Sequence, residues 1–154
     1  MLYTAVPAGW FTSNFNLTGH GHTASLEFNW IGEQGQAVVD GIECQISKEG
    51  LINAVWSLNV EGQKIATARK PSMFTSQFEI EGPTGLLTLQ RAHAFGRLFL
   101  LKQGTELIAT IKPAGWFTRT LNLEVYNTEL EFPVLTLVVW LRLLLIRRDQ
   151  KNNS

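Results

Sequence analysis

The sequence predicts a mostly β fold of repeated antiparallel hairpins, a barrel or a sandwich, followed by one hydrophobic C-terminal helix. Glycines recur at short intervals, and the runs between them are short and rich in β-branched and aromatic residues, which is typical of a many-stranded barrel or sandwich. The one long apolar run lies at 134–146. With 154 residues the chain fits one domain, which we expect at 1–148, with a core helix at about 133–148 and a polar tail at 149–154.

The last expected strand shows the pattern most clearly. Leu121, Leu123 and Val125 alternate with Asn122 and Glu124. This period of two places the apolar side chains on one face of a strand. By the same pattern and composition, strands are expected within 24–31, 37–47, 51–60, 86–91, 98–102, 107–112 and 118–126.

A hexapeptide, Pro-Ala-Gly-Trp-Phe-Thr, occurs at 7–12 and again at 113–118, and a weaker copy, Met-Phe-Thr, lies at 73–75. The last two copies are preceded by Ile-Ala-Thr, at 65–67 and 108–110. The favoured interpretation is a structural corner, in which glycine lets the backbone bend and the aromatic side chains fill the core beneath it. The alternative is a pair of aromatic binding sites.

The apolar run at 134–146 has the features of a helix that must be surrounded on all sides. Pro133 suits the first turn, and Arg147 and Arg148 follow where cations favour a helix C-terminus. The run rises about 20 Å, against a hydrocarbon core of ~30 Å, and Arg142 would be costly to insert into it. We therefore expect a helix buried inside the barrel, with Arg142 reaching the barrel mouth or meeting a carboxylate. The alternative is a membrane anchor.

The repeated hairpins, the glycine turn ahead of Ile-Ala-Thr, the terminal apolar helix and the chain length together resemble the tubby C-terminal-like superfamily, which includes the phospholipid scramblases and the LURP-one-related proteins. The resemblance covers nearly all of 3–146 and implies a closed antiparallel barrel around a central hydrophobic helix. Tubby proteins bind phosphoinositides through basic side chains, and the nearest basic cluster in this sequence is the pair Arg69-Lys70. The alternative folds are a β-trefoil, which has no place for the helix, and a cupin-like barrel.

Charge and cysteine content restrict the partners and the compartment. The 13 basic and 13 acidic residues balance, which removes the usual electrostatic basis for nucleic-acid binding, so no nucleic acid is expected. The single cysteine, Cys44, is expected to be a small core residue and fits a reducing, cytoplasmic compartment. Membrane association stays open, because Arg147, Arg148 and Lys151 could meet lipid head groups.

Three residues form the only group with the composition of a metal site: His20, His22 and Glu27. A His-x-His pair on a strand points both rings to one side, and its spacing resembles the first cupin motif. The second cupin motif should supply another histidine, and this chain has Thr88 there. We therefore interpret 19–22 as an exposed turn and expect no metal, no cofactor and no catalytic residue.

The expected function is thus a non-catalytic binding module that acts on a lipid surface or a protein partner. The alternatives are a small metal-dependent enzyme of cupin type, and a tail-anchored protein whose β domain is displayed at a membrane. Lipid binding is an implication of the resemblance, and no residue in the sequence marks a site for it.

Overall fold

Twelve antiparallel strands are followed by one long helix in a computed structural model that describes residues 1–29 and 31–153. The elements, in chain order, are β1 (Leu2–Pro7), β2 (Phe15–Gly19), β3 (His22–Phe28), β4 (Gly35–Val39), β5 (Ile42–Glu49), β6 (Val55–Val60), β7 (Gln63–Arg69), β8 (Phe78–Gly82), β9 (Gly85–Arg91), β10 (Phe99–Gln103), β11 (Glu106–Pro113), β12 (Leu121–Val125) and α1 (Phe132–Asn152). Each strand pairs with its neighbours in sequence, and β1 pairs with β12 to close the barrel.

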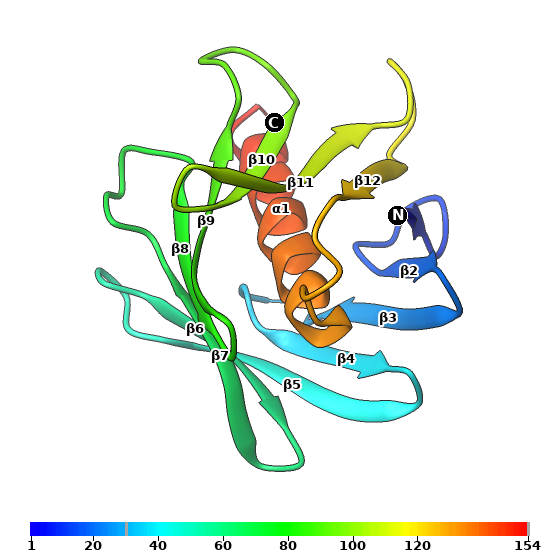
Figure 1. Ribbon diagram of the computed structural model, residues 1–154. Coiled ribbons are helices and arrows are strands. Elements are labelled where there is room, and N and C mark those ends of the chain that lie inside the picture. Colours follow the sequence, from blue (N-terminus) through cyan, green and yellow to red (C-terminus); the bar gives the residue numbers. More distant parts are fainter. Residues whose placement is uncertain (30, 154) are drawn as a thin grey trace.

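The helix α1 runs through the middle of the barrel (Figure 1). A barrel of eight strands is already filled by its own side chains, so a barrel of twelve needs something more inside it. From Val134 to Leu145 every residue of α1 is buried, and the inward positions of the strands include many small side chains that leave room for it. These small residues are Ala5, Ala24, Ala37, Ala66, Ala68 and Ala109.

The predicted closed barrel around a C-terminal helix is therefore confirmed, and the helix is a barrel core element and not an anchor. In the part of the chain that the structure describes, no helix combines the length and the apolarity needed to cross a bilayer. The helix is longer than expected, because it continues through Asp149 and Gln150 to Asn152, where a polar tail was predicted. Cys44 is buried as expected, and burial raises the pKa of its thiol.

The two ends of the barrel differ in how they connect the strands. At one end, which we call the turn end, five tight turns of two residues join β2 to β3, β4 to β5, β6 to β7, β8 to β9 and β10 to β11. The pairs His20-Gly21, Asp40-Gly41 and Glu61-Gly62 have positive φ at both positions, which is the geometry of a type I′ turn. The predicted strand at 37–47 is in fact two strands, because the Asp40-Gly41 turn divides it.

At the other end, which we call the loop end, six longer loops join the remaining strand pairs. They are 8–14, 29–34, 50–54, 70–77, 92–98 and 114–120. The helix enters the barrel at the turn end, after the connection at 126–131, and its C-terminus emerges at the loop end. The strand expected at 24–31 ends at Phe28, and Trp30 lies outside the described residues.

The two Ile-Ala-Thr segments adopt the same irregularity in β7 and β11. In the β6–β7 pair, Leu58 lies opposite Ala66 and Asn59 opposite Lys64, so Ile65 is an extra residue. The β10–β11 pair repeats this arrangement with Ile108 as the extra residue. Such a bulge bends a strand and increases its twist, which helps a sheet to close.

Candidate functional site

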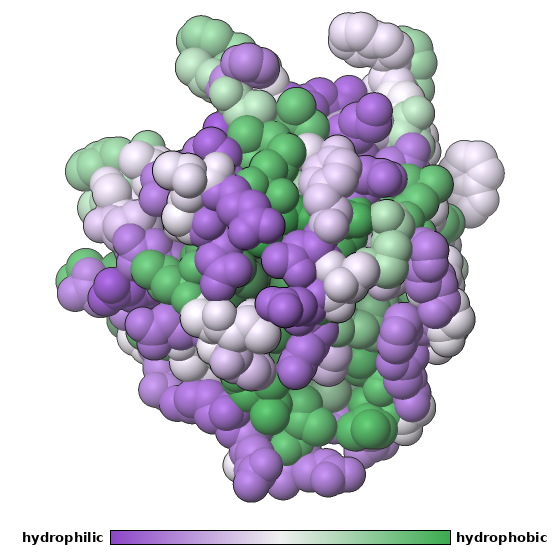
Figure 2. Space-filling model, viewed as in Figure 1, coloured by the Kyte–Doolittle hydropathy of each residue, from purple (hydrophilic) through white to green (hydrophobic). Residues whose placement is uncertain are grey.

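The loop end carries large apolar side chains that are exposed to solvent. Each of the six loops contributes at least one of them, and Figure 2 shows hydrophobic side chains standing out from the margins of the molecule. We call them the apolar tips: Trp10, Phe11, Ile31, Leu51, Ile52, Met73, Phe74, Phe95, Trp116 and Phe117. The tight turns at the opposite end contain no such side chain.

The repeated hexapeptide forms part of this surface and not of the core. Its two copies lie in the loops at 8–14 and 114–120, which are neighbours because β1 pairs with β12. Trp10 is 92% exposed and Trp116 is 86% exposed, and the phenylalanine after each is fully exposed. The expectation that these aromatic side chains fill the core beneath a corner was therefore wrong. Exposed apolar groups gathered on one face mark an interaction surface.

Charge is distributed unequally between the two ends, although the chain as a whole is neutral. Basic residues predominate in the loops and in the last turns of α1: Lys70, Arg97, Arg119, Arg147, Arg148 and Lys151, against the acidic Glu33 and Asp149. The turns and the 126–131 connection at the other end hold Asp40, Glu61, Glu129 and Glu131 and no lysine or arginine. The loop end is therefore a surface that attracts anions.

The C-terminal part of α1 is tied to the loop at 29–34. Arg148 places Nη2 2.6 Å from Oε1 of Glu33, and Lys48 of β5 places Nζ 2.7 Å from the same oxygen. Arg147 donates to the carbonyl of Gly32. Burial alone would raise the pKa of Glu33, but the hydrogen bonds from Arg148 and Lys48 outweigh burial and lower the pKa to about 2. Glu33 thus holds the end of the helix in place at the barrel mouth.

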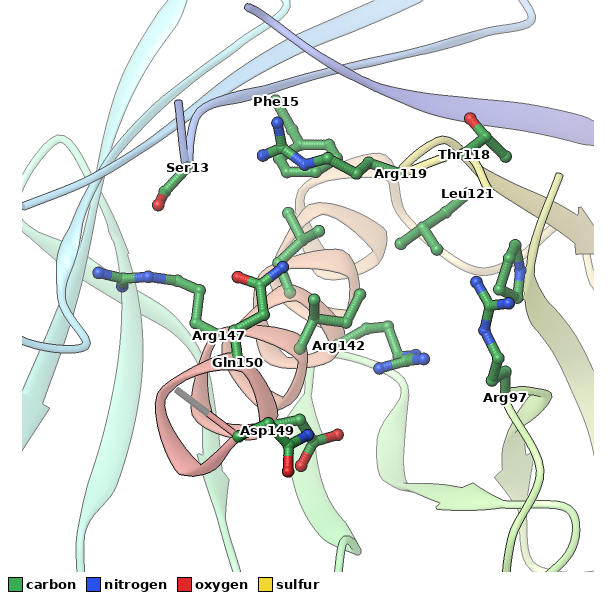
Figure 3. Close-up of a pocket in the computed structure, with 14 residues that line it drawn as sticks. Ser13, Phe15, Arg97, Thr118, Arg119, Leu121, Arg142, Arg147, Asp149 and Gln150 are labelled. Atoms are coloured by element: carbon green, nitrogen blue, oxygen red, sulfur yellow. The ribbon is translucent and has the colours of Figure 1, made fainter. Parts of the chain in front are cut away.

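A cavity of about 560 Å³ opens at the loop end between α1 and the barrel wall. Figure 3 shows basic side chains from separate segments around it, Arg97 and Arg119 from loops and Arg142 and Arg147 from the helix. Phe15, Leu121, Leu143 and Ile146 supply an apolar wall. The sequence pattern singled out Arg142 but did not predict this basic cluster, because its members are far apart along the chain and only the closed barrel brings them together.

Arg142 is the most unusual member of the cluster. Its side chain is buried, its guanidinium lies 4.2 Å from the centre of the Phe99 ring, and its Nε is a buried donor without a hydrogen-bond partner. Burial lowers the pKa of Arg142 to about 10, and the nearby charge of Arg91 adds to the shift while Asp149 opposes it. Among the described residues no carboxylate forms an ion pair with Arg142. It reaches the barrel mouth, one of the two outcomes expected from the sequence.

Arg119 connects the two loops that carry the repeated hexapeptide. Its guanidinium donates to the carbonyl oxygens of Gly9, Trp10 and Thr12 across the β1–β12 seam and lies 5.4 Å from the centre of the Phe15 ring. Arg97 similarly donates to the carbonyl of Trp116. These bonds hold the loops, and with them the exposed tryptophans, in a defined arrangement.

The histidines that were considered as metal ligands, and for which no metal was expected, have other contacts. His20 accepts a hydrogen bond from the backbone N–H of Leu2, and Nδ1 of His22 lies 2.7 Å from Asp40. His22 and Glu27 are an odd number of residues apart on β3, so their side chains point to opposite faces of the sheet. Residues 1–29 and 31–153 contain no group of three or more His, Cys, Asp or Glu side chains close enough to hold a metal ion.

Comparison of the chain with protein-family models, with curated proteins and with solved structures found no match. The loop end is therefore interpreted from its own geometry and chemistry.

Proposed function

We propose that the protein is a non-catalytic binding module that docks through its loop end on an anionic membrane surface. The observation that carries the proposal is the presence of exposed apolar tips on all six loops at one end of the barrel. Aromatic and aliphatic side chains above a basic rim are the composition of interfacial membrane-binding surfaces, since the apolar groups enter the head-group region and the cations stay at its edge.

A fluid lipid surface suits these tips better than a folded protein does. The tips belong to separate loops and stand apart from one another, so a protein partner would need a matching pocket for each. Lipid head groups rearrange around every tip. The basic residues at the same end complement anionic lipids, each adding about 1 kcal/mol near the surface of such a membrane.

The number of tips matters for the energetics. Burying one large apolar side chain contributes about 1.5–3 kcal/mol, whereas association costs at least about 4 kcal/mol in lost freedom of motion. One or two tips would therefore bind weakly, and a complete ring is needed for stable docking. The loops are short, and hydrogen bonds from Arg97 and Arg119 hold the two that carry the hexapeptide, which lowers the entropy cost of contact.

We also propose kinship with the tubby-like superfamily. A barrel of hairpins in chain order around a C-terminal helix supports this kinship. The functional proposal is independent of it, because it rests on the exposed side chains and their charge surroundings.

Vesicle flotation tests the proposed function. We expect the protein to float with phosphatidylcholine vesicles that contain about 30% phosphatidylserine and to bind pure phosphatidylcholine much less. Replacing Trp116 and Phe117 together with serine should weaken binding about tenfold or more, because two tips no longer enter the interface.

The matched control replaces two exposed apolar residues near the turn end, Ile42 and Leu86, with serine. This variant should bind like the unaltered protein. Equal loss in both variants, or no binding of the unaltered protein to anionic vesicles, would contradict the proposal. A soluble protein captured through the loop tips in place of vesicles would assign the surface to a protein partner.

A further inference from the structure

Arg142 presents a problem of stability that the fold alone does not solve. It is a charged residue in the largely apolar stretch 134–146 of α1, 5% exposed, with a buried Nε that lacks a partner. A buried charge without a hydrogen-bonded partner destabilises a protein, and a hydrophobic residue of similar size is usually neutral or stabilising in its place. Arg142 therefore needs a reason that lies outside the packing of the core.

The surroundings of Arg142 indicate what is missing. Arg91 and Arg97 are close enough to lower the pKa of Arg142 by repulsion. Asp149, whose negative charge opposes this shift, lies 3.6 Å from Nη2 of Arg91, and so it is already engaged. The guanidinium side of the cavity is thus an unneutralised positive region, and an anion that entered it would gain charge-assisted hydrogen bonds in a partly desolvated place.

We propose that this cavity binds the phosphate group of an anionic phospholipid, with Arg142 as the central donor and Arg97 at the rim. The inference rests on the proposed function, because docking of the loop end is what brings lipid to the cavity. The cavity volume of about 560 Å³ is within the usual range for small-molecule sites. Its apolar wall, with Leu143 and Ile146 of α1, offers a surface for the first part of an acyl chain.

The planar guanidinium fork is the group that matches a phosphate best, because two parallel N–H donors can meet two oxygens. A bidentate contact with one arginine uses only two of the acceptor positions of a phosphate, which leaves positions for Arg97. A neutral or zwitterionic head group would leave the excess positive charge uncompensated. The cavity is therefore expected to select lipids by net negative charge at the phosphate.

Three water-soluble probes separate the sources of the anion in isothermal titration of the full chain. They are short-chain dihexanoyl phosphatidic acid as a monomer, inorganic phosphate, and uncharged dihexanoylglycerol. We expect one phosphatidic acid per chain, with an affinity about tenfold or more above that of inorganic phosphate because of the apolar wall. Inorganic phosphate binding as tightly as phosphatidic acid would overturn the lipid assignment. Dihexanoylglycerol binding as tightly would overturn the anion site.

Arg142→Met removes the charged guanidinium and keeps an unbranched, apolar side chain in its place. It should weaken phosphatidic acid binding about tenfold or more, which is the loss expected for a charge-assisted hydrogen bond, and the thermal midpoint should stay level or rise. Arg69→Met, on the outer wall of the barrel, is the matched control and should leave the affinity unchanged. Unchanged affinity in Arg142→Met would refute the proposal.

Two further variants keep the test decisive. If Arg142→Met does not fold, the exposed Arg97→Met replaces it, and full retention of binding in that variant counts against the site. The variant with serine at Trp116 and Phe117 should lose vesicle binding and still bind monomeric phosphatidic acid. Failure of docking and failure of the phosphate site therefore give different results.

Discussion

At the scale of the residue, Gly35 shows how closely the helix fits the barrel wall. A Cβ at this position would lie 2.7 Å from the Trp140 ring and 2.0 Å from the carbonyl oxygen of Glu27. Trp140 is fully buried and stacks on Phe28 with ring centres 3.8 Å apart, so it has no room to move. The absence of a side chain at Gly35 therefore leaves room both for the backbone of the neighbouring strand β3 and for Trp140 of the helix.

We therefore expect Gly35→Ala to destabilise the protein by about 1–3 kcal/mol, as overpacking of a core does. Urea unfolding followed by fluorescence measures it. Gly62→Ala, at a turn-end position where a Cβ meets open space but φ is +82°, is the comparison that isolates backbone strain from crowding. A Gly35 variant as stable as the unaltered protein would show that the helix is free to shift.

A second residue-scale prediction concerns Glu33 and pH. Its pKa in the folded protein is about 2, below the ordinary value of 4.5, because Arg148 and Lys48 stabilise the carboxylate more than burial opposes it. A carboxylate with a lowered pKa contributes stability above its ordinary pKa, and this contribution is lost as pH falls from about 4.5 toward 2.

The thermal midpoint of the protein should therefore fall as the pH is lowered across this range. The thermal midpoint of Glu33→Gln should fall less steeply. Glu106→Gln, at an exposed position of β11, is the control and should follow the unaltered protein. Parallel pH curves for the unaltered protein and the Glu33 variant would contradict the assigned role of the ion pairs at the end of the helix.

At the scale of the element, α1 forms the centre of the barrel core, and the inward side chains of the strands pack around it (Figure 1). Each buried leucine or valine of the helix contributes about 1.5–3 kcal/mol, and a whole domain has a net stability of only ~5–15 kcal/mol. We expect a chain that ends at Phe132 to aggregate or to lose cooperative melting, and Leu141→Asp to do the same. Leu141→Met keeps the volume and should melt normally. A soluble, cooperatively melting 1–132 chain would show that the barrel does not need its helix.

The elements also show what the sequence could reveal. The glycine turns and the run at 134–146 were sufficient for a many-stranded β domain with a buried helix, because periodicity and an apolar surface on all sides report burial directly. The closure of the barrel around that helix was expected from the resemblance to the tubby-like fold. Asp40-Gly41 is a strong hairpin signal, and it is this turn that divides the segment 37–47 between β4 and β5. The exposed Trp-Phe pairs were assigned to the core, because adjacent aromatic residues beside glycine look the same in a corner and at a loop tip.

The basic cavity was beyond prediction for a different reason. Arg97, Arg119 and Arg142 come from two loops and a helix, and their proximity depends on strand order and on the depth at which α1 sits. The sequence identified only Arg142 as out of place. That sign was informative, since a charge that breaks a strong local pattern is often retained for function.

At the scale of the whole molecule, the net charge is zero, but the charges are unevenly distributed between the two ends of the barrel. The balance of basic and acidic residues argued against nucleic acid, but the barrel separates the two signs, with cations around the loops and carboxylates around the turns. A molecule of this kind is oriented by the field of an anionic bilayer before it touches it. In the proposed docking the loop end would face the membrane, because the acidic turn end would be repelled from it.

This orientation predicts how salt affects binding to anionic vesicles. Added salt shortens the range of charge attraction from about 10 Å at 0.1 M to about 3 Å at 1 M, so binding should weaken steeply. The binding that remains at high salt should depend on the apolar tips.

Replacing Lys70 and Lys151 with glutamine should weaken binding to anionic vesicles at low salt, whereas the same change at Lys64 and Lys102, near the turn end, should not. Equal effects of the two lysine pairs would mean that net charge governs the approach to the membrane, and the oriented docking proposed for the loop end would be wrong.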